Sequence, residues 1–69
     1  MRRYRFRNFV IVANTSYDLT TFVVRCKGRL VFKFRDVLTS KTLKNNDLMT
    51  SYFKNALYDV EIGEYYAIF

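Results

Sequence analysis

The chain has 69 residues, of which 51% are hydrophobic and 19% aromatic, and it carries a formal net charge of +6 without any histidine. A chain of this length forms one domain, residues 1–69, with a small core, and its apolar content excludes intrinsic disorder. Without histidine it lacks the base of a Ser-His or Cys-His nucleophile system, and the single Cys26 cannot bind a metal alone. We therefore expect a protein that is not an enzyme and that uses no metal or cofactor.

The basic residues gather in the first part of the chain. Residues 1–44 hold 11 basic and 2 acidic side chains, a net charge of +9, whereas residues 45–69 hold 1 basic and 4 acidic side chains, a net charge of −3. This asymmetry favours an anionic partner on one side of the molecule.

Residues 3–13 are predicted to form the first strand, in which three arginines alternate with Tyr4 and Phe6 before the apolar run Phe9–Ala13. Both faces of the second half are apolar, which is typical of a strand covered on both sides. Asn8 breaks the alternation, and we expect a bulge there.

The apolar run Phe9–Ala13 is too short for a secretion signal, and no stretch of the sequence approaches the roughly 20 apolar residues of a membrane helix. Cys26 has no disulfide partner within the chain. These observations predict no membrane partner and a cytoplasmic protein in a reducing compartment.

After a turn over residues 14–18, the segment 21–35 predicts a β-hairpin around Gly28. A three-residue loop, Lys27–Arg29, brings six apolar side chains to one face: Phe22, Val24, Cys26, Leu30, Phe32 and Phe34. A two-residue loop would instead pair Phe22 with Lys33 and split the apolar side chains between the two faces, so the odd loop is favoured.

The other face of this hairpin has aliphatic residues in its middle and cations at its ends. Together with the basic residues of the first strand and of the loop, these cations are the candidate binding residues for nucleic acid or another partner. They are Arg3, Arg5, Arg7, Arg25, Lys27, Arg29, Lys33 and Arg35.

Residues 36–45 are predicted to be a loop with one helical turn. The apolar residues between Leu48 and Leu57 recur at helical spacing, which predicts an amphipathic helix at about 47–57 with Asn46 as its cap. The apolar tail, residues 60–69, predicts a final strand. The expected fold is α+β, in which a mostly antiparallel sheet of order β-β-β-α-β carries one helix on one face.

The first functional hypothesis is a nucleic-acid-binding module, for DNA or RNA, whose exposed sheet face places arginines on phosphates. Tyr4, Phe9 and Tyr17 are candidates for stacking on bases where they are exposed.

The second hypothesis is a small inhibitor or adaptor that docks its arginine and aliphatic surface onto an acidic patch of a larger protein. The absence of catalytic groups suits an accessory protein of the kind that phages encode against host or defence enzymes. A homo-oligomer is compatible with both hypotheses, with Tyr65, Tyr66 and Phe69 at the contact.

Overall fold

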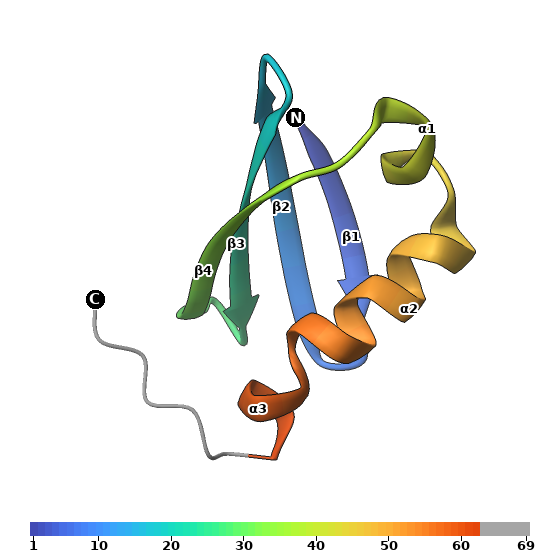
Figure 1. Ribbon diagram of the computed structural model, residues 1–69. Coiled ribbons are helices and arrows are strands. Elements are labelled where there is room, and N and C mark those ends of the chain that lie inside the picture. Colours follow the sequence, from blue (N-terminus) through green and yellow to red (C-terminus); the bar gives the residue numbers. More distant parts are fainter. Residues whose placement is uncertain (63–69) are drawn as a thin grey trace.

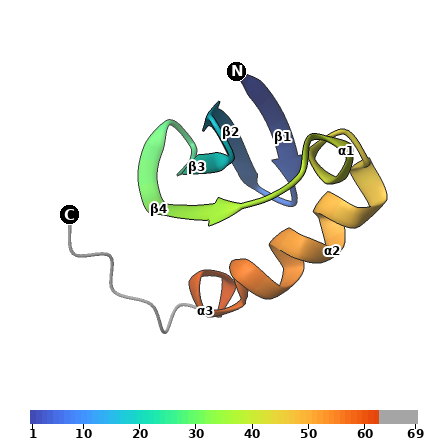
Figure 2. The ribbon, with the colours of Figure 1, turned by 45° about the horizontal axis from the view of Figure 1, so that its top comes forward.

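The computed structural model describes residues 1–62, which form an antiparallel sheet and three short helices (Figure 1). The elements are β1 (Arg2–Phe6), β2 (Phe9–Ser16), β3 (Leu19–Cys26), β4 (Arg29–Val37), α1 (Ser40–Leu43), α2 (Asn46–Ala56) and α3 (Tyr58–Glu61). The four strands lie side by side in chain order, β1-β2-β3-β4, and each pairs with the next. Figure 2 shows that the helices lie on one side of the sheet. The predicted α+β class is confirmed.

The predicted first strand over residues 3–13 is wrong, because the chain reverses at Arg7 and Asn8 and makes a hairpin of β1 and β2. Phe6 pairs with Phe9, and Arg5 pairs with Val10. The backbone of Arg7 has a positive φ of 54°, a conformation that residues other than glycine seldom adopt. The break in alternation at Asn8 is therefore a turn and not a bulge.

All three hairpins have two-residue turns, at residues 7–8, 17–18 and 27–28, and the first residue of each turn has a positive φ. The predicted turn over residues 14–18 is wrong in its first part, because Asn14–Ser16 belong to β2 and only Tyr17-Asp18 form the turn, whereas the predicted strand start at Leu19 is confirmed. In the last turn both Lys27 (φ 54°) and Gly28 (φ 78°) are left-handed, as a type I′ turn requires. This turn twists in the same sense as the strands it joins.

The β3–β4 hairpin combines a two-residue turn with a β-bulge. Cys26 pairs with Arg29 next to the turn, but the register shifts between Val24 and Arg25, so that Phe22 and Val24 pair with Phe34 and Phe32 as predicted. The predicted three-residue loop Lys27–Arg29 and the predicted pair of Cys26 with Leu30 are therefore both wrong, because Arg29 belongs to β4 and the extra residue lies within that strand, between Leu30 and Phe32. The bulge shifts the alternation of β4 by one residue, so that Phe32 and Phe34 face the core together with Val24 and Phe22.

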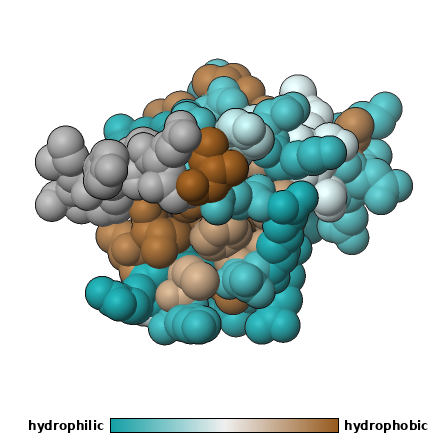
Figure 3. Space-filling view, turned by 90° about the horizontal axis from the view of Figure 1, so that it is seen from below, coloured by the Kyte–Doolittle hydropathy of each residue, from teal (hydrophilic) through white to brown (hydrophobic). Residues whose placement is uncertain are grey.

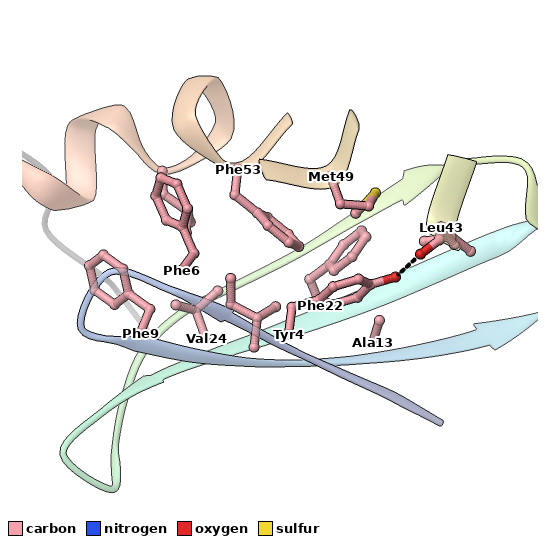
Figure 4. Packing of buried hydrophobic residues seen from close by; sticks show 11 residues of the cluster. Tyr4, Phe6, Phe9, Ala13, Phe22, Val24, Leu43, Met49 and Phe53 are labelled. Carbon is pink, nitrogen blue, oxygen red and sulfur yellow. Dashed lines mark hydrogen bonds between the residues drawn. The ribbon is translucent and has the colours of Figure 1, made fainter. Parts of the chain in front are cut away.

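The core lies between the sheet and α2, and aromatic rings fill it. Phe22 and Phe53 are each no more than 1% exposed, and their rings meet edge to face with centroids 5.7 Å apart. The Tyr4 ring packs edge to face on Phe53 at 5.2 Å, and Phe34 stacks on Phe22 at 4.8 Å. Figure 4 shows Phe53 and Met49 reaching from α2 toward the side chains of the sheet.

Two tyrosine hydroxyls tie the helices to the sheet. The Tyr4 hydroxyl donates a buried hydrogen bond of 2.6 Å to the Leu43 carbonyl at the end of α1 (Figure 4). The Tyr52 hydroxyl of α2 donates to the Asp36 carboxylate of β4, also at 2.6 Å. Each bond joins a strand at the edge of the sheet to a different helix, so the two bonds fix both sides of the helical layer.

The α2 helix spans Asn46–Ala56, close to the predicted range 47–57, but its N-cap is Asn45 rather than Asn46. The Asn45 side chain accepts a hydrogen bond of 3.1 Å from the Leu48 amide. The predicted helical turn within residues 36–45 is α1, and Thr39 caps it in the same way.

The predicted final strand over residues 60–69 differs from the structure where it can be compared. Val60 and Glu61 belong to α3, and residues 63–69, with the predicted oligomer contact Tyr65, Tyr66 and Phe69, lie outside the described residues. Over residues 1–62 the order is four strands followed by three helices, instead of the predicted β-β-β-α-β.

The end of the molecule near α3 presents apolar surface between hydrophilic residues (Figure 3).

The substitution Tyr4→Phe tests the bond between β1 and α1. Loss of the hydroxyl leaves the buried Leu43 carbonyl without its donor, and the free energy of unfolding should fall by about 1–2 kcal/mol. Urea denaturation followed by circular dichroism measures this change. The matched control is Tyr17→Phe, whose side chain is 100% exposed and which should change nothing. Equal stability of both variants would contradict a structural role for the bond.

Candidate binding face of the sheet

The face of the sheet opposite the helices, hereafter the open face, carries the side chains that alternate with the core residues. In β1, Tyr4 and Phe6 are buried and Arg3 and Arg5 are exposed, and the other strands alternate in the same way. We define the open face by the residues of its central rows, which are Arg3, Arg5, Val10, Val12, Asn14, Thr21, Val23, Arg25, Leu30, Lys33 and Arg35, and a further row of Ser16, Leu19 and Val37 lies beside the β2–β3 turn.

Strand pairing arranges these side chains in rows across the sheet. One row runs Arg3, Val12, Val23, Lys33, and so has a cation at each edge and two valines between them. The next row toward the β1–β2 turn runs Arg5, Val10, Arg25, Leu30. On the other side, the row Asn14, Thr21, Arg35 is polar. The open face therefore has a half-buried valine centre with cations around it.

No carboxylate among residues 1–62 lies on the open face. Asp36 points to the helix side, where it binds Tyr52, and Asp18 is in the β2–β3 turn. The remaining acidic side chains of the described chain belong to α2 and α3. Arg3, Arg5, Arg25, Lys33 and Arg35 consequently form no ion pair with any described residue. No two of these cations are paired directly in the register, but they share one face, and a bound anion lowers the repulsion among them.

Three of the eight candidate binding residues do not lie on this face. Arg7 is in the β1–β2 turn and forms an ion pair with Glu61 of α3, on the helix side. Lys27 is in the β3–β4 turn, and Arg29 pairs with Cys26 beside that turn. Arg7 and Lys27 nevertheless line one hollow together with Arg5, so the positive surface continues around this end of the sheet.

The predicted base-stacking residues are not on the open face either. Tyr4 and Phe9 are 8% and 9% exposed and belong to the core, and only Tyr17, at the tip of the β2–β3 hairpin, is exposed. Six strand aromatics face the helix side: Tyr4, Phe6, Phe9, Phe22, Phe32 and Phe34.

Three aliphatic members of the open face, Val10, Val12 and Leu30, do not follow from the sequence pattern. The apolar run of Val10 and Val12 predicts a strand covered on both sides, whereas helices cover only one side of β2. Leu30 was assigned to the core, but the bulge turns it to the open face opposite Arg25 and lets Val31 pack against the core. Valines 12 and 23 line a shallow hollow of the open face with Lys33 and Arg35.

Among residues 1–62, the groups with a shifted pKa are Tyr4 and Tyr52, and both belong to the core side. Burial raises the pKa of the Tyr4 phenol, and nearby Arg2 partly opposes this shift. Burial, followed by the hydrogen bond and the negative charge of Asp36, raises the pKa of the Tyr52 phenol strongly. The raised pKa values mean that both phenols stay neutral and keep the proton with which they donate their hydrogen bonds to Leu43 and Asp36.

Within residues 1–62, no group of three or more His, Cys, Asp or Glu side chains is placed to hold a metal ion. The helices of the same range are too short and too polar to cross a bilayer. Compared with family models, with curated proteins and with solved structures, the chain gives no match. The class of the molecule is therefore defined by its own geometry, a four-stranded α+β domain with a cationic open face.

The shifted Tyr52 pKa predicts alkaline sensitivity. A phenol whose pKa is raised by folding contributes stability below its unfolded pKa of about 10, and this contribution disappears as the pH rises further. Tyr52→Phe lacks the ionisable group, so its unfolding free energy should fall less than that of the wild type above about pH 10. Urea denaturation at several pH values measures this, with Tyr17→Phe as a control that should follow the wild type.

Proposed function

We propose that this protein is a non-enzymatic binding module whose open face binds the phosphate backbone of nucleic acid. The observation that carries the proposal is the set of five cations, Arg3, Arg5, Arg25, Lys33 and Arg35, on one face that has no carboxylate among residues 1–62. Arginine suits this role because its planar guanidinium donates paired hydrogen bonds to phosphate oxygens.

Phosphate binding would compensate an unfavourable feature of the sheet. Arg5 and Arg25 lie in the same row with only Val10 between them, about 10 Å apart along the sheet by the usual strand spacing. Nothing anionic within the described chain lies between them. A bound polyanion neutralises such charges and releases its condensed counterions, which favours binding at low salt.

The double substitution Arg25→Glu with Arg35→Glu tests the proposal. It puts two carboxylates among the remaining cations, and affinity for mixed-sequence nucleic acid should fall at least tenfold at low salt. The salt slope should decrease by roughly one unit for each phosphate that the variant no longer neutralises. Fluorescence anisotropy across salt concentrations measures both quantities.

The matched control is Lys44→Glu with Lys54→Glu, which makes the same change in net charge on the helical side of the molecule. If this control weakened binding as much as the open-face variant, net charge alone would explain the affinity. Absence of binding to any nucleic acid at low salt would refute the proposal.

A second candidate function, docking on an acidic patch of a larger protein as an inhibitor or adaptor, is favoured by the aliphatic centre of the open face. Protein interfaces usually have an apolar centre and a polar rim, and arginine is enriched among their anchor residues. Val12 and Val23 lie side by side in that centre and are half-buried by their neighbours.

The two candidate functions respond differently to Val12→Thr with Val23→Thr. Threonine keeps the branched shape that suits a strand but adds a hydroxyl to the apolar centre. Recovery of a partner from nuclease-treated lysate should fall several-fold for this variant if a protein docks there, while nucleic-acid affinity stays within about twofold if phosphates are bound by the cations. Quantitative pull-down and anisotropy compare the two.

A further inference from the structure

We infer that the partner of the open face is a nucleic-acid duplex, read through its two backbones without sequence preference, rather than a single strand. This inference rests on the proposed function and adds to it the form of the ligand. It follows from two features of the sheet, the location of its aromatic rings and the spacing of its cations.

The first feature is that the eleven positions that define the open face, all within residues 1–62, carry aliphatic, polar or basic side chains and no aromatic ring. Modules that bind single strands on a sheet stack bases on exposed rings, and this stacking supplies roughly 1–3 kcal/mol per base. Here the strand aromatics pack under α2 instead, as the contacts of Phe22 and Phe53 illustrate. As far as the described residues form it, the open face therefore offers phosphate contacts but no platform for unstacked bases.

The second feature is the placement of cations along both edges of the sheet. Arg3 and Arg5 are on the edge strand β1, and Lys33 and Arg35 are on the opposite edge strand β4. The row that joins Arg3 to Lys33 crosses three strand spacings, so the Cα atoms of these residues lie roughly 14 Å apart.

This separation is comparable to the distance between two backbones across a groove, since the major groove of B-form DNA is about 12 Å wide. A duplex offers two rows of phosphates, one for each cationic edge, whereas an extended single strand offers one. Between Arg3 and Lys33 this row holds only Val12 and Val23, which cannot donate hydrogen bonds to base edges, whereas Asn14, Thr21 and Arg25 lie in the neighbouring rows. In the Arg3–Lys33 row the duplex is therefore held by its backbones, and backbone contacts give affinity without sequence preference.

The test compares a mixed-sequence DNA duplex of about two helical turns, 20 base pairs, with the single strand of the same length and with polyglutamate as a polyanion without phosphates. The duplex should bind at least tenfold more tightly than the single strand. If four phosphates are neutralised, the duplex affinity should fall roughly a hundredfold between 50 and 200 mM salt. A second duplex of shuffled sequence should bind within about twofold of the first.

Two matched variants test whether both edges bind the duplex. Arg3→Ala with Arg5→Ala removes the β1 cations, and Lys33→Ala with Arg35→Ala removes the β4 cations. Each should lower duplex affinity about tenfold and reduce the salt slope by roughly 1.8, because each leaves two phosphates without a cation. Circular dichroism verifies that both variants remain folded.

The outcomes separate this inference from the proposed function. A single strand that binds as tightly as the duplex, or an edge variant that leaves duplex affinity unchanged, would overturn the duplex inference while nucleic-acid binding stands. Polyglutamate that binds as tightly as DNA, or no binding of either nucleic acid, would overturn both.

Discussion

The packing of α2 on one side of the sheet, centred on the contact between Phe53 and Phe22, is the constraint on which the rest of the structure depends. A domain of this size has one small core, and aromatic rings fill it with the largest buried area per side chain. Because the strand aromatics are committed to that core, the other side of each strand is left to valines and cations. The character of the open face is thus a consequence of how the core is built.

Alternation of side chains carries this constraint across the whole sheet. An error of one residue in register would turn an entire strand over, so the chain keeps parity even where its turn would break it. The bulge of β4 opposite Val24 and Arg25 does this. It allows a tight type I′ turn at Lys27-Gly28 and still returns Phe32 and Phe34 to the core. Lys33 and Arg35 consequently reach the open face, where they complete its second cationic edge.

Part of the positive charge of the molecule is paired with a carboxylate within the fold, and part faces the solvent. Arg7 is neutralised by Glu61, and this ion pair connects the β1–β2 turn with α3. The open-face arginines have no such counterpart in the described chain. This positive charge, which is uncompensated within residues 1–62 and surrounds an apolar centre, is the observation from which the anionic partner is proposed.

The sequence alone determined the α+β class, the α2 helix, the shared core face of Phe22, Val24, Phe32 and Phe34, and the opposite placement of Arg25, Lys33 and Arg35, because these features follow from local periodicity. Only the tertiary structure decided that Arg7 lies in a turn and that Leu30 and Val31 exchange faces. A left-handed arginine and a bulge leave little local signal, since each is fixed by the pairing of strands and by the burial of side chains that belong to other elements.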